Sequence, residues 1–190
     1  MFGFSTDPIK KVRVGIIGLG NRGNTLLEML QYLVESNHAE IIALSDISEK
    51  KVIKAANKLA VWQARKASTY YKSQTEWKKL AEREDIDLVI ISTPWKLHAP
   101  MAVYCMENKK HVASEVPIAS TIEDCWKIIQ TSERTKKHCM MMENCNYNEE
   151  ELWILNMIQE GVFGDITHSE GAYLHDLRAL LLDDTYYQDQ

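Results

Sequence analysis

Three glycines with Gly-x-Gly-x-x-Gly spacing, Gly18, Gly20 and Gly23, constrain the fold of this chain more than any other feature. A short apolar run, Val12–Ile17, ends immediately before them, and helical periodicity follows over residues 25–34. A strand, a glycine turn and a helix in that order predict the phosphate-binding turn of a dinucleotide-binding fold. The alternative, a glycine-rich turn that binds no ligand, is disfavoured by this strand–turn–helix context.

Each glycine of the turn has a separate expected role. Gly18 permits the tight turn, Gly20 lets the backbone approach a pyrophosphate, and Gly23 allows close packing of the helix on the strand. The amino terminus of the helix then attracts the phosphates.

Asp46 follows the second predicted strand, residues 40–45. A carboxylate at this position accepts hydrogen bonds from the adenosine ribose hydroxyls and repels a 2′-phosphate. NAD is therefore favoured over NADP. The alternative is that Asp46 only caps the helix that begins nearby.

Strands alternate with helices along the first three quarters of the chain. This alternation predicts an α/β fold of the Rossmann type, a doubly wound parallel sheet, over residues 1–145. The expected strands are 12–17, 40–45, 87–92, 111–114 and 139–143, with a short strand or a loop at 70–73. The expected helices are 25–34, 48–66, 75–83, 98–108, 121–137 and 148–160. Residues 146–190 are expected to begin a second, truncated domain, in which 165–173 alternate like a strand of another sheet.

Polar residues follow three of the predicted strands, and the carboxyl ends of parallel strands are where such sheets bind ligands. Trp95 offers a flat face to a ribose or nicotinamide, or alternatively packs on the following helix. Glu115 is a candidate acceptor for ribose or nicotinamide groups, and the Val116–Pro117 bond is a candidate cis peptide. Asn144 follows the last strand.

A cluster of polar residues lies in the segment 171–178, where Tyr173, His175, Asp176 and Arg178 occur within six residues. Tyr173 is the candidate catalytic base and His175 a second candidate. A phenol acts as a base only if its pKa is lowered, which Arg178 or a bound cofactor could achieve. The alternative is a surface turn with an ion pair.

Composition excludes several classes of function. The 190 residues include 22 Lys and Arg against 27 Asp and Glu, so the chain has no electrostatic reason to bind nucleic acid or anionic lipid. No run reaches the roughly 18 apolar residues of a membrane span. No export signal is visible at the start, so the expected location is cytoplasmic, or exported if a signal was removed. The four cysteines are expected to be free and mostly buried, and no metal site is expected.

Five segments together resemble the Gfo/Idh/MocA oxidoreductase superfamily and, more narrowly, glycoside hydrolase family 109, the NAD-dependent α-N-acetylgalactosaminidases. The segments are VGIIGLGNRG at 14–23, TPWKLH at 93–98, EVP at 115–117, MEN at 142–144 and GAYLHDLR at 171–178. The resemblance implies a Rossmann domain followed by an α/β domain with an open antiparallel sheet. Family members continue past residue 190, so the chain is expected to be a fragment.

The resemblance also implies a site. NAD contacts are expected at Asn21, Arg22, Asp46, Trp95, Lys96, Leu97, His98, Glu115, Val116 and Asn144, with Tyr173 contacting the sugar. The implied reaction oxidises C3 of the sugar, eliminates the aglycone, adds water and returns the hydride from NADH. Sugar dehydrogenases of the superfamily usually carry Glu-Lys-Pro where this chain has Glu115, Val116 and Pro117, and valine is neither acid nor base.

Two other functions stay open on the sequence. The chain could be an NAD-dependent sugar or cyclitol dehydrogenase, which would release NADH. It could also be a nucleotide-binding module without catalysis, because a shared fold does not fix function. A glycoside or sugar is the expected small-molecule partner, and a homo-oligomer is a possible assembly.

Overall fold

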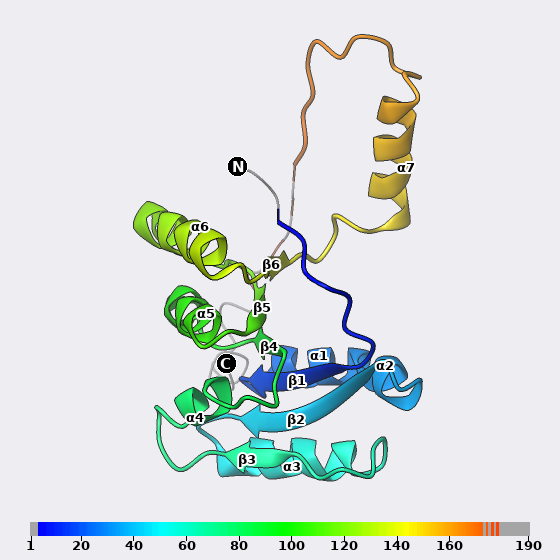
Figure 1. Cartoon of the computed structure of the whole chain (residues 1–190). Coiled ribbons are helices and arrows are strands. Elements are labelled where there is room, and N and C mark those ends of the chain that lie inside the picture. The colour runs from blue at the N-terminus through cyan, green and yellow to red at the C-terminus, as the bar shows by residue number, and fades with distance from the viewer. Residues whose placement is uncertain (1–3, 173, 175, 177, 179–190) are drawn as a thin grey trace. The chain divides into compact units, whose positions relative to one another are not determined.

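The computed structural model describes residues 4–172 together with 174, 176 and 178. The chain divides into two compact units, one that extends to Met142 and a second that begins at Glu143. The first unit contains the whole parallel sheet and its covering helices, and the second contains a single helix among the described residues (Figure 1).

The sheet of the first unit has six parallel strands in the order β3-β2-β1-β4-β5-β6. The strands are β1 Val12–Ile17, β2 Ala39–Ser45, β3 Ser68–Tyr70, β4 Leu88–Ile91, β5 His111–Glu115 and β6 Cys139–Met142. The central strands are mostly apolar because helices cover both faces of the sheet. This order and direction confirm the predicted Rossmann-type doubly wound fold.

Helices cover both faces of the sheet (Figure 1). One face is covered by α1 Asn21–Met29, α2 Gln31–Glu35 and α3 Glu49–Leu59, and the other by α4 Trp77–Ala81, α5 His98–Glu107 and α6 Ile122–Thr135. Each face has its own apolar core. Leu27 of α1 and Leu59 of α3 are buried in one core, and Leu80 of α4 and Met106 of α5 in the other.

The order of the strands determines where the candidate site lies. The chain moves outward from β1 through β2 to β3, then returns to place β4 on the other side of β1. The loops that follow β1 and β4 therefore diverge, and doubly wound sheets bind their ligands in the crevice at this point. Both the glycine turn and residues 93–98 lie here.

Two predicted helices differ from those observed. The helix expected over 48–66 ends at Leu59, because the Gln63 side chain instead bonds the backbone of β2: its Oε1 accepts from Ile41 N at 3.0 Å and its Nε2 donates to Ile41 O at 2.9 Å. The helix expected over 25–34 begins earlier, at Asn21, and is followed by the separate helix α2.

The second unit contains α7, Glu149–Gln159, close to the expected 148–160. The strand expected over 165–173 is wrong for residues 165–172, which form no strand, and Tyr173 lies outside the described residues. A strand needs a partner to accept its hydrogen bonds, and residues 165–172 pair with no strand of the described chain. The predicted open antiparallel sheet is therefore not observed in this part of the chain.

The four cysteines are free, as predicted, but they are not mostly buried. Cys105 is buried and Cys139 half-buried, and burial raises the pKa of each of these two thiols to about 12. Cys125 and Cys145 are exposed.

Candidate functional site

The glycine turn after β1 is packed so closely that larger residues do not fit. Gly18 has a φ of +91°, and a methyl group added to it would lie 2.5 Å from Ser92 O. A methyl group on Gly23 would lie 2.1 Å from Gly18 O, so the first turn of α1 rests directly against the loop. The roles predicted for these two glycines follow from these contacts. Helix α1 has Gly20 as its N-cap, a residue without a side chain to occupy the amino-terminal N–H groups.

Ser92, which sequence reasoning missed, holds this turn to the end of β4. Its hydroxyl donates to Gly18 O at 2.8 Å, and its backbone N–H donates to Ile17 O at 2.9 Å. The only sequence signal for this role is a small hydroxyl residue at a strand end. The loop after β1 is therefore hydrogen-bonded to the end of β4, just before the two loops separate.

Asp46 holds the turn from the side of β2. Its Oδ2 accepts from Leu19 N at 2.7 Å and its Oδ1 accepts from Ser48 N at 2.8 Å. The second bond closes a turn before α3 and the first fixes the glycine loop; the N-cap of α3 is Ser48, so Asp46 is not the helix cap that the alternative interpretation expected. The residue stays partly exposed, and a carboxylate has about four acceptor positions, so capacity for ribose hydroxyls remains.

The segment after β4 separates into exposed and buried residues. Trp95, Lys96 and Leu97 form a short 3-10 helix, η1, and are exposed, with 64% exposure for Trp95. This exposure opposes the alternative that Trp95 packs on α5. His98, in contrast, is only 1% exposed. Its Nε2 lies 2.6 Å from Thr93 O and its Nδ1 lies 2.8 Å from Pro117 O.

Arg22 and Glu115 connect α1 to the end of β5. The guanidinium Nε donates to Glu115 Oε1 at 2.7 Å, and Glu115 is 6% exposed. The Val116 N–H also donates to the Glu115 carboxylate, at 3.4 Å. The Val116–Pro117 peptide is cis, as the sequence suggested. The structure thus brings the residues predicted after β1, β2, β4 and β5 to one edge of the sheet.

Three residues predicted for the site are not placed at this edge by the structure. Asn144 belongs to the second unit, and Tyr173 and His175 lie outside the described residues. Arg178 pairs with Asp176 at 2.6 Å, and both residues are exposed. The alternative of a surface ion pair therefore holds for these two side chains.

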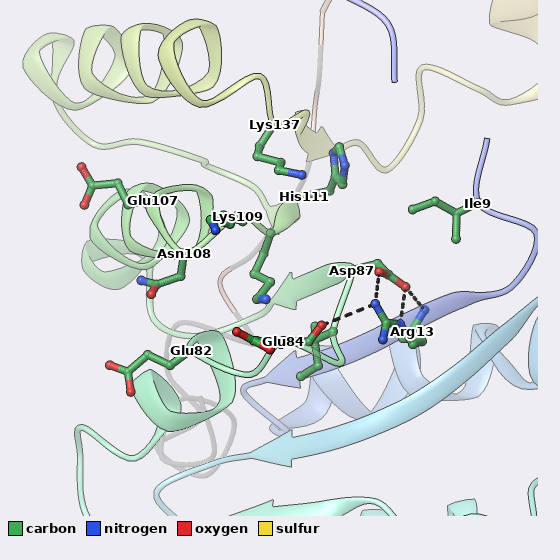
Figure 2. A pocket seen from close by; sticks show the side chains of 12 residues that line it. Ile9, Arg13, Glu82, Glu84, Asp87, Glu107, Asn108, Lys109, His111 and Lys137 are labelled. Carbon is green, nitrogen blue, oxygen red and sulfur yellow. Dashed lines mark hydrogen bonds and ion pairs between the residues drawn. The ribbon is translucent and has the colours of Figure 1, made fainter. Parts of the chain in front are cut away.

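A hollow of about 490 Å³ lies at the opposite, amino-terminal edge of the sheet (Figure 2). It is lined by residues at the starts of β1, β4 and β5, among them Arg13, Asp87 and His111. The glycine turn does not line it, although ligands of such folds bind at the carboxyl edge. The hollow is therefore separate from the candidate cofactor site.

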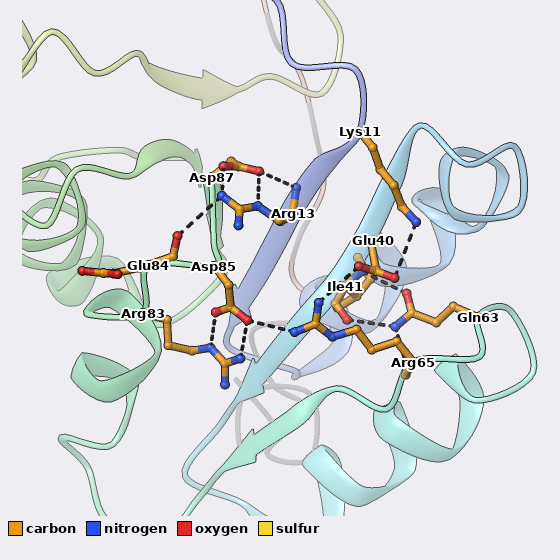
Figure 3. A network of polar contacts seen from close by, with 10 residues as sticks. All are labelled: Lys11, Arg13, Glu40, Ile41, Gln63, Arg65, Arg83, Glu84, Asp85 and Asp87. Carbon is orange, nitrogen blue, oxygen red and sulfur yellow. Dashed lines mark hydrogen bonds and ion pairs between the residues drawn. The ribbon is translucent and has the colours of Figure 1, made fainter.

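Ion pairs join residues in and next to the strands at this amino-terminal edge (Figure 3). Asp85 accepts from Arg83 at 2.7 Å and from Arg65 at 2.9 Å, and the Arg83 hydrogen bond is the main cause that lowers the Asp85 pKa to about 2. Arg65 also reaches Glu40, at 3.5 Å. Arg13 and Asp87 form a two-bond pair between β1 and the residue before β4, with distances of 2.6 and 2.9 Å.

None of the helices in the described part of the chain combines the length and the apolar composition of a membrane-spanning segment. Within residues 4–172, 174, 176 and 178, no group of three or more His, Cys, Asp or Glu side chains could hold a metal ion.

Comparison with known families defines the class of protein. A family model described as the oxidoreductase family with an NAD-binding Rossmann fold matches residues 12–143, and the chain belongs to this Gfo/Idh/MocA family. A second model, the C-terminal domain of glycosyl hydrolase 109, matches residues 147–190. The family resemblance expected from the sequence is confirmed, and so is NAD as the cofactor of this fold.

Individual relatives agree with these matches. The chain is 48% identical over 184 residues to an α-N-acetylgalactosaminidase from Bacteroides fragilis, and 44% identical over 178 residues to one from Shewanella oneidensis. These alignments cover 97% and 94% of this chain but 42% and 38% of the relatives. The chain therefore spans less than half the length of the curated relatives it matches.

Solved structures show the same fold. The WlbA dehydrogenase of Chromobacterium violaceum, solved with NADH and UDP-GlcNAcA, matches with a TM-score of 0.72 and 25% identity over 86% of this chain and 44% of that one. A scyllo-inositol dehydrogenase from Lactobacillus casei, solved with NAD(H) and scyllo-inositol, matches with a TM-score of 0.71 and 21% identity over 83% of this chain and 44% of that one.

Proposed function

We propose that this chain is the cofactor-binding part of a glycoside hydrolase that acts on α-N-acetylgalactosaminides and uses NAD without consuming it. One observation carries the proposal: the match to the glycosyl hydrolase 109 C-terminal domain directly follows the NAD-binding Rossmann match on the same chain. The two relatives above, both named α-N-acetylgalactosaminidase, support the sugar substrate.

The cofactor site that we propose consists of the carboxyl edge of the sheet. The glycine turn and the amino terminus of α1, with Asn21 and Arg22, receive the pyrophosphate, because N–H groups there face a bound anion. Asp46 accepts from the adenosine ribose. Trp95 offers its exposed ring to the nicotinamide ribose. NAD, when bound, supplies reversible hydride transfer, and the protein positions it against the sugar.

We assign His98 a positioning role instead of the direct cofactor contact implied by the family resemblance. Its ring is buried, and both nitrogens face backbone carbonyl oxygens, one in the loop after β4 and one in the loop after β5. A carbonyl oxygen only accepts, and a neutral imidazole has one N–H, so His98 donates to one of the two carbonyl oxygens and lies against the other. His98 therefore holds the backbone that surrounds the cofactor.

Val116 supports a hydrolase over a simple dehydrogenase. It follows Glu115 at the end of β5, where the superfamily's sugar dehydrogenases usually carry a lysine that assists proton transfer. Valine has no group that can take the hydroxyl proton, so a base elsewhere is required. Elimination of the aglycone needs a base that removes the proton at C2 of the sugar. We propose Tyr173 as this base and as a sugar contact, with His175 as a second candidate and Asn144 as a further cofactor contact.

A chimaera tests the proposal. In the full-length Bacteroides fragilis relative, the segment that aligns with this chain is replaced by the corresponding segment of this chain, an alignment of 184 residues. Release of an aryl group from an aryl α-N-acetylgalactosaminide is followed together with NADH absorbance. We expect release of the aryl group with no net NADH, and loss of release with retained NAD binding in Tyr173→Phe. Net NADH would instead indicate a dehydrogenase, and bound NAD without any sugar conversion would indicate a binding module.

A further inference from the structure

The strand β6 lies at one edge of the sheet. Among the described residues it pairs with β5 and with no other strand. It has four residues, of which Met140 and Met141 are exposed. An edge strand has fewer partners for its backbone groups than a central strand has. A hydrogen bond lost at the start of β6 therefore loosens this strand more readily than one lost from a central strand such as β1.

A histidine side chain accepts one of the hydrogen bonds at the start of β6. The backbone N–H of His138, the residue before this strand, donates to His111 Nδ1 at 3.1 Å. The carbonyl oxygen of His138 accepts from Val112 N at 2.9 Å, and the backbone N–H of His111 donates to Asp87 O at 2.9 Å. The His138 ring also stacks on the His111 ring, with centroids 5.4 Å apart, and on Phe4, at 4.6 Å. The His111 side chain thus joins the start of β5 to the start of β6.

The bond between His138 N and His111 Nδ1 requires a neutral His111 ring. A ring nitrogen accepts a hydrogen bond only when it carries no proton, so the single proton of the neutral ring lies on Nε2. In the charged form both ring nitrogens carry hydrogens, and Nδ1–H would face the N–H of His138. The bond is therefore present in one protonation state of His111 and lost in the other.

The surroundings of His111 favour the neutral state near neutral pH. Burial is the main cause that lowers the pKa of His111 below its ordinary value of 6.5. The charges of Lys137 and His138 lower this pKa further, whereas Asp87 opposes them. Asp87 is itself bonded to Arg13 through both of its oxygens, and Lys110 adds a positive charge next to His111 in the chain. Stabilisation by the neutral ring is therefore complete above the ordinary value and is lost as the pH falls below it.

We propose that His111 is a pH-sensitive switch for the edge strand: the neutral ring holds the start of β6 through the N–H of His138, and protonation releases it. Protonation also places a positive charge against the stacked His138 ring and near Lys137, which Figure 2 shows beside His111. β6 ends at Met142, and the next residue begins the second unit. The switch therefore acts on the strand that leads into the second unit, and it does not depend on the proposed function.

The test measures amide hydrogen exchange by NMR at about pH 7.5 and about pH 5, on either side of the ordinary histidine pKa. Protection factors, the ratios of intrinsic to observed exchange rates, correct for the pH dependence of the exchange chemistry. The protection factor of the amide at position 138 should fall at least about threefold at the lower pH in the wild-type chain. His111→Asn places an acceptor oxygen, which does not titrate, where Nδ1 lies, so protection should then be the same at both pH values.

Two matched variants separate the acceptor from the other histidines. His111→Phe keeps a flat ring without an acceptor, so the amide at position 138 should be weakly protected at both pH values. His138→Asn keeps the backbone donor and should keep the pH dependence. His168→Asn, at an exposed position of the second unit, should behave as wild type.

Two results would overturn the proposal. One is a wild-type protection factor at position 138 that does not change with pH, and the other is an unchanged pH dependence in His111→Asn, since another group would then titrate. If the variants do not fold, the wild-type chain still decides. Its loss of protection must follow the NMR titration of the His111 ring, at a pH below the ordinary value of 6.5, and a loss that follows another group contradicts the switch.

Discussion

The two edges of the parallel sheet use their polar residues differently. At the amino-terminal edge, side chains pair mainly with other side chains, as Arg83, Asp85 and Arg65 do (Figure 3). At the carboxyl edge, Asp46 and His98 bond to backbone groups of the loops. The side-chain pairs stabilise the amino-terminal edge, whereas the bonds to backbone groups fix the loops of the proposed cofactor edge.

The largest effect is expected from Gly23→Ala, which disturbs the carboxyl edge. The added methyl group would lie 2.1 Å from Gly18 O, a backbone atom that cannot move away without shifting the turn. We expect a loss of about 2–3 kcal/mol in the free energy of unfolding and at least about a tenfold loss in NAD affinity. Urea unfolding and a binding titration measure the two effects. Gly171→Ala is the matched control, because no atom lies within 4 Å of its added methyl group, and equal effects of the two variants would contradict the account.

A pair of amide substitutions compares the edges directly. Glu115→Gln weakens the bond from Arg22, and Asp87→Asn weakens the pair with Arg13. Each should destabilise the chain by about 1–2 kcal/mol, since each leaves an arginine less well paired. Only Glu115→Gln should lower NAD affinity, by at least about threefold. A similar loss of NAD affinity in both variants would show that the edges are not independent.

Asp46→Asn tests whether the carboxylate makes the chain prefer NAD over NADP. The amide removes the negative charge and keeps only one acceptor oxygen, so it also loses one of the two bonds to Leu19 and Ser48. We expect the ratio of NAD to NADP affinity to fall about tenfold, because the repulsion of the 2′-phosphate is lost. Parallel titrations with the two nucleotides give the ratio. An unchanged ratio would mean that Asp46 acts only through its bonds to Leu19 and Ser48.

The smallest effect on the free energy of unfolding is expected from protonation of Asp85, at the amino-terminal edge, at low pH. The folded-state pKa of Asp85 is about 2, below its ordinary value of 3.8, so its stabilisation is complete above the ordinary value and is lost as the pH falls toward 2. Its side chain is 34% exposed, which limits the effect to no more than about 1 kcal/mol.

Unfolding by urea at about pH 6 and about pH 2.5 measures this loss. Asp85→Asn should lose less stability between the two conditions than the wild-type chain, and Asp165→Asn, in the second unit, should behave as wild type. An equal loss in Asp85→Asn and the wild-type chain would exclude Asp85 as a source of the pH dependence.

The sequence predicted the parts of the fold that depend on local pattern. Val12–Ile17 and the glycine turn were correctly placed because a nearly continuous apolar run and glycine spacing are local signals. The end of α3 was not correctly placed, because it depends on a hydrogen bond between the Gln63 side chain and the backbone of Ile41 in β2. Propensity within the helix carries no information about such a contact.

The residues of the candidate site were predicted, but several contacts between them were not. Asp46 and Glu115 were found because each ends a predicted strand. The bond from Ser92 to Gly18 and the pair of Arg22 with Glu115 were missed, since both join residues far apart in the chain. Only the register between neighbouring strands brings these groups together.

A titration with NAD, followed by tryptophan fluorescence and with NADP in parallel, tests the central claim most directly. Trp95 is exposed at the proposed site and should report binding, and Trp95→Phe should lose the signal while calorimetry still detects the nucleotide. The account predicts saturable binding of NAD, with NADP at least about tenfold weaker. No binding of NAD by a chain that unfolds cooperatively would contradict it.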